Sequence, residues 1–162
     1  MSEIILITGV PGFGKTTIGD YLEEKHGFLN LDIEAWREWN KSLLKLRDLF
    51  ANNELAEFIP EAERINNKIV ITWGFVPGGN DETVLGLVRL GAKMIWFDGN
   101  REAGKRVYIQ RNGSAEAIEA LNAQIDRINA MDLSRFNARI INTFDASGEF
   151  LLKEEIVTLI RK

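Results

Sequence analysis

The sequence contains no cysteine and only one histidine, His26. The lack of cysteine excludes disulfides, zinc sites built on thiolates and cysteine nucleophiles, and it indicates a reducing compartment. His26 precedes Gly27 at the end of a segment with helical spacing, where we expect it to cap a helix rather than to catalyse. Any chemistry must therefore come from other residue types.

Long hydrophobic runs are also missing. No apolar stretch approaches the roughly 20 residues that a membrane-spanning helix needs. The first apolar run, Ile4–Ile7, is too short for the core of a secretory signal and has no basic leader. We therefore expect a cytoplasmic protein that does not associate with membranes.

Neither sign of charge is in large excess. The formal net charge is −4, so the chain has no general attraction for a polyanion and we do not expect nucleic acid as a partner. Prolines number only 3, and no linker rich in Pro or Ser divides the sequence. With 162 residues, 45% of them hydrophobic, the chain fits a single domain, residues 1–162, with one core.

One stretch near the start matches a complete phosphate-binding motif. The run Gly9-Val10-Pro11-Gly12-Phe13-Gly14-Lys15-Thr16 fits G-x-x-x-x-G-K-[ST] between an apolar strand and a segment with helical spacing. Its glycines let the backbone turn and expose N–H groups to an anion, toward which the following helix also points its positive end. A Gly-rich turn that carries a lysine by chance is the alternative, and the number of ordered constraints disfavours it.

The motif assigns a role to each polar residue of this loop. Lys15 is expected to reach the β- and γ-phosphates of a nucleoside triphosphate, and the Thr16 hydroxyl to bind a Mg²⁺ shared with them. Thr17 is expected to contact the α-phosphate. The residues expected to bind the nucleotide in this region are Gly9, Pro11, Gly12, Phe13, Gly14, Lys15, Thr16 and Thr17.

The rest of the chain alternates between strand and helix patterns. This alternation predicts an α/β domain with one doubly wound parallel sheet and helices on both faces. Strands are expected at 4–7, 28–31, 68–75, 93–98 and 138–143, and helices at 15–26, 80–90, 114–131 and 151–162. The segment 35–62 is helical throughout and longer than one crossover needs, so we expect two helices that form a flap, with a break at Pro60 or at 51–53.

Two carboxylates follow the second predicted strand. Asp32 and Glu34 arrive at the carboxyl end of this strand, the edge of an open sheet where ligands bind. We expect one of them to orient Mg²⁺ and the other to accept the proton of an acceptor hydroxyl, with Asp32 assigned to both the metal and catalysis. Two solvated carboxylates, or a helix cap, are the alternative.

Aromatic residues accompany these acids. Trp36 and Trp39 follow directly and are suited to stack on an aromatic or sugar ring, although their helical spacing favours core packing for at least one. The Gly-rich turn after the third strand begins near Trp73 and Gly74. The residues expected to line the acceptor pocket are Glu34, Trp36, Arg37, Trp73 and Gly74.

A basic cluster follows the fourth strand. Its members are Arg101, Lys105, Arg106 and Arg111. We expect the segment at about 99–114 to act as a lid, with Arg101 binding the nucleotide and Arg106 and Arg111 stabilising charge on the transferring phosphate. An ordinary solvated helix face is the alternative. Asp98, which ends an apolar strand, also has the form of a Walker B acid that holds Mg²⁺ through water.

The positions of these features resemble the small P-loop kinases, which include shikimate, gluconate and adenylate kinases. The resemblance rests on the early loop, the Asp-x-Glu after strand two, the Gly-rich turn after strand three, the basic segment and the Asp-Ala-Ser-Gly turn at 145–148. It implies a three-layer P-loop NTPase fold whose five strands have the order 2-3-1-4-5. It also implies Asp32 near the magnesium or the acceptor, residues 73–79 around the acceptor, and Ala146 and Ser147 beside the adenine.

The sequence departs from each named kinase. Shikimate kinases have Asp-x-Asp and a Gly-Gly-Gly turn where this chain has Asp32-Ile33-Glu34 and Trp73-Gly74-Phe75, and the Asp-Gly-[FY]-Pro-Arg run of adenylate kinases is missing. We expect a monomeric or homodimeric kinase that uses ATP and Mg²⁺ to phosphorylate a hydroxyl or a phosphate of a small molecule. The alternatives are an NTP-hydrolysing module that uses Asp98, and a polynucleotide 5′-kinase that uses Asp32 and Arg37.

Overall fold

The computed structural model describes residues 1–75 and 77–162. Its centre is a five-stranded sheet in the order β2-β3-β1-β4-β5, and every ladder in it is parallel. The strands are β1 (Glu3–Gly9), β2 (Leu29–Asp32), β3 (Lys68–Thr72), β4 (Lys93–Asp98) and β5 (Arg139–Asn142). The predicted fold class and strand order are confirmed.

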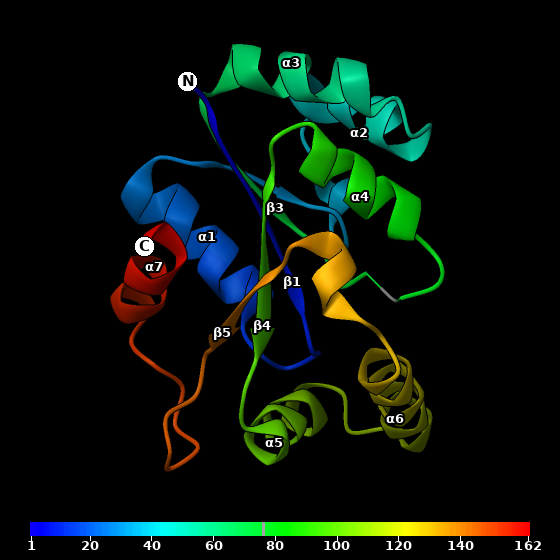
Figure 1. Cartoon of the computed structure of the whole chain (residues 1–162), viewed down its shortest axis with the longest axis vertical. Coiled ribbons are helices and arrows are strands. Elements are labelled where there is room, and N and C mark those ends of the chain that lie inside the picture. Colours follow the sequence, from blue (N-terminus) through cyan, green and yellow to red (C-terminus); the bar gives the residue numbers. More distant parts are fainter. Residues whose placement is uncertain (76) are drawn as a thin grey trace.

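Helices connect the strands, because successive parallel strands need crossover connections. The helices are α1 (Lys15–His26), α2 (Leu44–Ala51), α3 (Leu55–Ile65), α4 (Asp81–Arg89), α5 (Arg101–Arg111), α6 (Ala115–Asn129) and α7 (Lys153–Arg161). Three short 3₁₀ turns complete the structure, η1 (Trp36–Glu38), η2 (Lys41–Leu43) and η3 (Leu133–Phe136). Helices α1 and α7 lie side by side at one side of the sheet (Figure 1). No helix in the described ranges is both long and apolar enough to cross a membrane.

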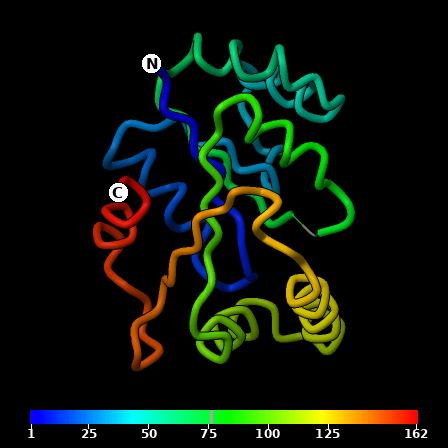
Figure 2. The backbone as a smooth tube through the Cα atoms, in the orientation of Figure 1, coloured from blue at the N-terminus to red at the C-terminus, as the bar shows by residue number. Residues whose placement is uncertain are grey.

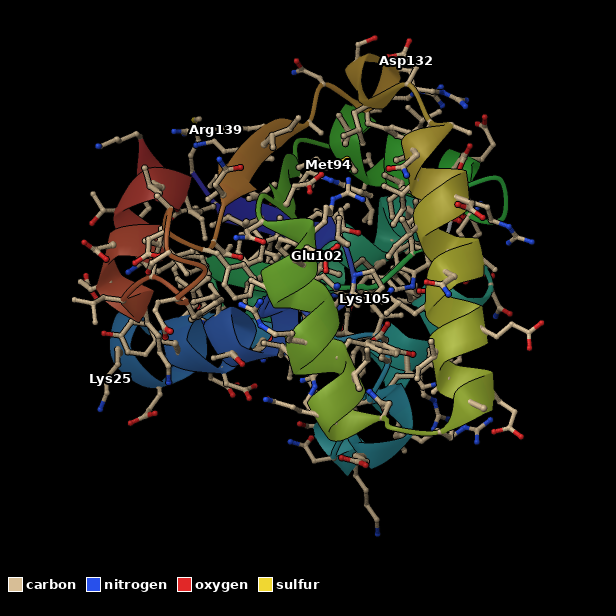
Figure 3. All side chains as sticks on the ribbon, turned by 90° about the horizontal axis from the view of Figure 1, so that it is seen from below. Lys25, Met94, Glu102, Lys105, Asp132 and Arg139 are labelled. Carbon is tan, nitrogen blue, oxygen red and sulfur yellow. The ribbon has the colours of Figure 1, made fainter. Side chains whose placement is uncertain are left out.

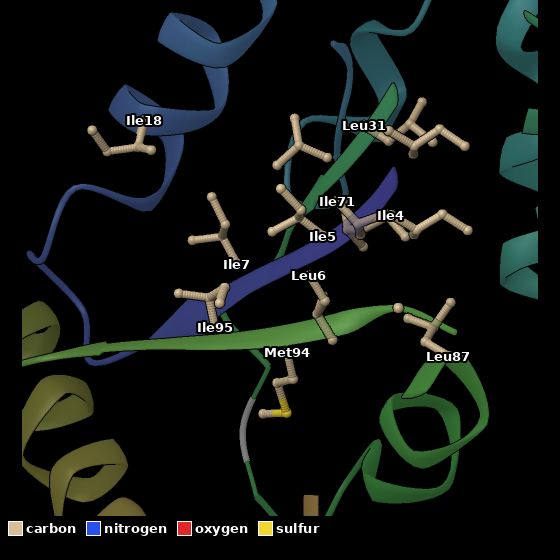
Figure 4. Packing of buried hydrophobic residues seen from close by; sticks show 14 of the residues in the cluster. Ile4, Ile5, Leu6, Ile7, Ile18, Leu31, Ile71, Leu87, Met94 and Ile95 are labelled. Atoms are coloured by element: carbon tan, nitrogen blue, oxygen red, sulfur yellow. The ribbon is translucent and has the colours of Figure 1, made fainter. Parts of the chain in front are cut away.

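The core lies on both faces of β1, the central strand. Leu6 and Ile7 are completely buried, and Figure 4 shows Ile7 on the side of α1 while Leu6 points the other way, toward Met94. Full burial of such a side chain stabilises a fold by about 1.5–3 kcal/mol. Because apolar residues fill both faces, β1 is rigid up to the point where the phosphate-binding motif begins.

The long helical segment after β2 is interrupted at one of the two predicted positions, residues 51–53, and not at Pro60. It forms η1, η2, α2 and α3, and the break between α2 and α3 falls at Asn53, whose φ of 59° is incompatible with a continuous helix. The alternative break at Pro60 is wrong, because Pro60 lies inside α3. Its ring is exposed there, so the carbonyl that loses an N–H partner can bind water.

Strand β3 is shorter than the strand expected at 68–75. Strand β3 ends at Thr72, so Trp73 and Gly74 belong to the following loop, although the Trp73 N–H still donates to the Ile7 carbonyl at 3.0 Å. Val76, part of the Gly-rich turn, lies outside the described residues. The segment expected to act as a lid is helix α5, and a short turn at 112–114 joins it to α6. Figure 3 shows these two helices as neighbours, with Glu102 and Lys105 on α5.

Candidate functional site

The phosphate-binding motif forms a tight loop between β1 and α1. Gly9, Gly12 and Gly14 have φ angles of 129°, 84° and 84°, values that other residues rarely adopt. A Cβ atom at Gly12 would also lie 2.2 Å from the carbonyl oxygen of Gly104 in α5. The loop therefore needs glycine both for its backbone path and for its close contact with α5.

Lys15 begins α1, and its side chain folds back over the loop. Its Nζ donates to the carbonyl oxygens of Gly9 at 3.2 Å and Val10 at 3.1 Å. Burial lowers the pKa of Lys15 to about 8, an effect that Glu34 and Asp32 oppose and that Arg111 adds to. The ammonium group is thus poorly solvated, and an anion bound in the loop would stabilise its charge.

Thr16 and Asp32 lie together, as the metal prediction requires. The Thr16 hydroxyl donates to Asp32 Oδ2 at 3.2 Å, which brings the start of α1 to the end of β2. The described residues hold no group of three or more His, Cys, Asp or Glu side chains that could bind a metal alone. A hydroxyl and a carboxylate are nevertheless ligands that Mg²⁺ prefers, and nucleotide phosphates ordinarily complete its shell.

Glu34 follows Asp32 through a tight turn of the chain. The Glu34 N–H donates to Asp32 Oδ1 at 3.0 Å, which closes a tight turn directly after β2. The Glu34 carboxylate then lies against the bare backbone of Gly74, where a Cβ atom would be 2.2 Å from Glu34 Oε1 and 3.7 Å from Lys15 Cε. The Glu34 side chain is exposed, and it lies near both the loop after β3 and the phosphate-binding lysine.

Two cavities meet at Glu34. The first, which we call the loop cavity, has a volume of about 280 Å³ and is lined by Pro11, Gly12, Glu34, Gly74, Tyr108, Arg111, Asn112 and Gln124. The second, which we call the tryptophan cavity, has a volume of about 600 Å³ and is lined by Ile33, Glu34, Trp36, Arg37, Phe50, Ala51, Asn53, Trp73, Asn80 and Thr83. Among the residues that the structure describes, Glu34 is the one in both linings. Four of the five predicted acceptor residues line the tryptophan cavity, and Gly74 lines the loop cavity.

The predicted lid arginines have different surroundings. Arg111, at the end of α5, lines the loop cavity beside the phosphate-binding motif. Arg101 instead pairs with Asp98 through Nε–Oδ1 at 2.5 Å and Nη2–Oδ2 at 2.9 Å. Arg106 extends toward the turn at 145–148, where its Nη2 would be 3.0 Å from a Cβ atom at Gly148. Of the three, Arg111 is the one that lines the loop cavity.

Asp98 does not contact the residues that would hold a metal. Its carboxylate accepts the ion pair from Arg101 and hydrogen bonds from the Gly99 N–H at 2.8 Å and Trp96 Nε1 at 3.3 Å. It lines a shallow hollow next to β5 rather than the loop cavity. In this structure Asp32, and not Asp98, is the carboxylate beside Thr16.

The turn predicted beside the adenine is anchored by its own aspartate. Asp145 Oδ1 accepts from the Ser147 N–H at 2.8 Å, the Ser147 hydroxyl at 2.7 Å and the Glu149 N–H at 3.0 Å. The hydrogen bond from the Ser147 side chain is the main reason why the pKa of Asp145 is lowered. Ala146 and Ser147 are exposed at the tip of this hairpin, which joins β5 to α7 (orange in Figure 2).

Helix α5 packs directly against the phosphate-binding loop. Phe13 is completely buried, packs edge-on against Phe144 at 5.2 Å, and leaves no space beside Gly104. The Thr143 hydroxyl donates to the Phe13 carbonyl at 3.0 Å. Phe13 therefore joins the loop to both α5 and the β5–α7 hairpin.

Gly104→Ala should destabilise the protein and displace α5, because the new Cβ atom would lie 2.1 Å from Phe13 Cε2. Overpacking of this kind costs about 1–3 kcal/mol of unfolding free energy. We expect a lower midpoint of urea unfolding and weaker nucleotide binding, with Gln110→Ala on the exposed side of α5 as the control. Unchanged stability and unchanged nucleotide binding in Gly104→Ala would contradict the tight contact between α5 and the loop.

Sequence patterns did not point to several of the lining residues. Tyr108, Asn112 and Gln124 reach the loop cavity from α5 and α6, and Phe50, Asn53, Asn80 and Thr83 reach the tryptophan cavity. A local signal existed only for Tyr108, which is three residues from both Lys105 and Arg111 and shares a helix face with them. The remaining residues come from separate elements whose packing no local pattern specifies.

The chain is similar in sequence to known shikimate kinases. No family model matches the chain. Shikimate kinase of Staphylococcus aureus strain MRSA252 is 29% identical over 155 residues, which cover 90% of this chain and 84% of that protein. The enzyme of strain JH9 is 28% identical over the same length.

Solved structures share the fold at lower identity. Shikimate kinase from Bacteroides thetaiotaomicron superposes with a TM-score of 0.59 at 18% identity and covers all of both chains, 100% in each case. A gluconokinase from Sinorhizobium meliloti 1021 superposes with a TM-score of 0.59 at 16% identity and covers 97% of this chain and 88% of its own. Sequence and fold together confirm the resemblance of this chain to the small P-loop kinases.

Proposed function

We propose that this protein is a kinase that transfers the γ-phosphate of Mg²⁺-ATP to a hydroxyl group of a small molecule. The observation that carries the proposal is the position of Glu34, which lines both the cavity at the phosphate-binding loop and the adjoining tryptophan cavity. A carboxylate at that junction is suited to contact an acceptor whose hydroxyl faces the terminal phosphate. The likeness to shikimate kinases and to a gluconokinase supports the same class of reaction.

The nucleotide would be held by the residues of the motif. Lys15 would contact the β- and γ-phosphates, Thr17 the α-phosphate, and Thr16 with Asp32 the metal. Mg²⁺, when bound, would neutralise charge on the phosphates. Arg111 would stabilise the transferring group from α5, Arg106 would support it from the same helix, and the turn with Ala146 and Ser147 would border the adenine.

Charge in the tryptophan cavity favours a hydroxyl over a phosphate as the acceptor. Its described lining includes a single base, Arg37, which is exposed, and a single acid, Glu34. A phosphate acceptor would place about two negative charges next to Glu34 and the nucleotide. Proteins bind phosphate groups with several cationic side chains. A hydroxyl instead offers a proton that Glu34 can accept.

In the proposed transfer, one bond to the γ-phosphorus forms as another breaks. The acceptor oxygen attacks the γ-phosphorus, its proton passes to the Glu34 carboxylate, and the bond between the γ-phosphorus and the bridging oxygen breaks to release ADP. Lys15 and Arg111 stabilise the charge that develops on the phosphoryl oxygens. Glu34 later returns its proton to solvent.

A thermal-shift screen tests the proposal. ATP with Mg²⁺ should raise the melting temperature, and a true acceptor should raise it further when added to a complex with a non-hydrolysable ATP analogue. ADP release should then depend on that acceptor. Absence of any stabilisation by nucleotide would contradict the assignment of a nucleotide site.

Thr16→Ala should weaken nucleotide binding mainly when Mg²⁺ is present. The variant removes the hydroxyl next to Asp32 but leaves the loop glycines and Lys15 in place. We expect the affinity for ATP to fall about tenfold or more with Mg²⁺ and to change little with EDTA, as calorimetry would measure. Equal losses in both conditions would show that Thr16 is not a metal ligand.

A further inference from the structure

The tryptophan cavity has an aromatic wall. Trp36 on η1 and Trp73 after β3 are half-buried in its lining, and Phe50 of α2 lies behind them. The Trp73 ring is fixed by Phe50, at 5.3 Å and 78°, and by Phe75, at 5.9 Å and 51°. Rigid indole faces bind the flat or C–H-rich faces of rings at low cost in conformational entropy.

Uncharged polar side chains line the same cavity from α4 and the α2–α3 connection. The Thr83 hydroxyl donates to Asn53 Oδ1 at 3.0 Å, which leaves the Asn53 NH₂ group as a donor. Asn80 stands at the N-cap position of α4, yet its side chain does not cap the helix. Two amides and a hydroxyl are therefore available to bind neighbouring hydroxyl groups of a ligand.

The charges in this cavity do not favour an anion. Glu34 and Arg37 are the only charged residues in the described lining, and their charges cancel. Arg37 on η1 and Glu34 are both exposed, so solvent and salt screen their charges. An acidic acceptor would approach both Glu34 and the nucleotide phosphates with only this screened cation to compensate.

We propose that the acceptor is an uncharged hydroxylated ring, that is, a sugar or cyclitol, or a nucleoside through its ribose. This inference rests on the proposed kinase function and specifies its substrate. The ring would stack on Trp36 and Trp73, its hydroxyls would bond to Asn53, Asn80 and Thr83, and the reacting hydroxyl would face Glu34.

Tryptophan fluorescence and ADP release test the inference separately. The neutral probes are glucose, myo-inositol and uridine, and the acidic probes are gluconate and shikimate. With a non-hydrolysable ATP analogue and Mg²⁺ present, we expect at least one neutral probe to quench the fluorescence, and the acidic probes to bind at least about tenfold more weakly. With ATP, the same neutral probe should stimulate ADP release.

Variants connect the binding to the cavity. Trp36→Ala and Asn80→Ala should each weaken binding of the neutral probe by about tenfold, with Trp36→Phe intermediate, while circular dichroism verifies folding. Arg37→Gln should weaken binding of the neutral probe less than either of these variants. The control Arg47→Gln, whose arginine pairs with Asp48 outside the cavity, should change it less than about twofold.

The experiment separates failure of the inferred acceptor class from failure of the proposed kinase function. If no neutral probe binds, or if only the acidic probes bind and Arg37→Gln abolishes their binding, the inferred acceptor class is wrong although the kinase proposal stands. If a neutral ring binds with the expected dependence on Trp36 and Asn80 but never stimulates ADP release, the ring site is supported and the kinase function is wrong.

Discussion

Replacing Lys15 with alanine should abolish phosphoryl transfer while leaving the fold intact. The side chain is not one of the hydrophobic residues that form the core, and within the described residues its Nζ donates to carbonyl oxygens of the loop, at 3.2 and 3.1 Å. It would be the main cation on the transferring phosphate, and loss of such a group costs about a thousandfold or more in rate. ADP release by Lys15→Ala should be undetectable over background, with a melting temperature close to that of the wild type.

The pH dependence of nucleotide binding should reveal the same lysine. Burial lowers the pKa of Lys15 from 10.5 to about 8, whereas bound phosphates favour its charged form. Above pH 8 the free protein loses this proton and must regain it to bind, so the wild-type affinity for ATP should fall as pH rises from 8 toward 10. Lys15→Ala should bind weakly at every pH without this fall. Wild-type turnover by the variant, or the same pH profile in both proteins, would overturn the role of Lys15.

Glu34→Gln should slow transfer by roughly a hundred- to ten-thousandfold while the affinity for ATP changes little. The amide is close in size to the carboxylate that lies against Gly74, but it cannot accept the proton of an acceptor hydroxyl. Single-turnover transfer and equilibrium ATP binding would separate the two effects. The acceptor used is the best one from the thermal-shift screen.

Asp32→Asn is the matched comparison, because Asp32 lies next to Thr16 at 3.2 Å and Glu34 does not. The loss of transfer rate in Asp32→Asn should be overcome in part by a higher Mg²⁺ concentration, whereas the loss in Glu34→Gln should not. If Glu34→Gln transfers phosphate normally and Asp32→Asn shows a loss that metal does not relieve, the two carboxylates have the opposite roles. The sequence alone had assigned the base to Asp32, and that alternative remains testable in this way.

Asp98→Asn distinguishes the kinase from an NTP-hydrolysing module. In a hydrolase that used Asp98 as a Walker B acid, this variant would lose hydrolysis in the absence of any acceptor. In the structure Asp98 is bound by Arg101, so we expect Asp98→Asn to lower stability by disrupting this ion pair while acceptor-dependent transfer persists. Severe loss of acceptor-independent hydrolysis would favour the module.

The sequence by itself determined the parts of the site that are contiguous in the chain. The phosphate-binding loop is a local structure in which glycine spacing, a preceding apolar strand and a following helix are all encoded within residues 4–26. The alternation of strands and helices likewise follows from local periodicity. The strand order was reached by resemblance rather than from periodicity, because periodicity does not specify which strands become neighbours.

Only the tertiary structure decided how side chains from different elements combine. The turn at Asp32 directs Glu34 to Gly74 and Lys15, and Arg101 binds Asp98 rather than lining the loop cavity. Gln124 reaches that cavity from α6, on a helix whose pattern shows only which face is apolar. Such contacts join residues far apart in sequence, and their energies depend on the packing of several elements at once, which no local pattern of residues records.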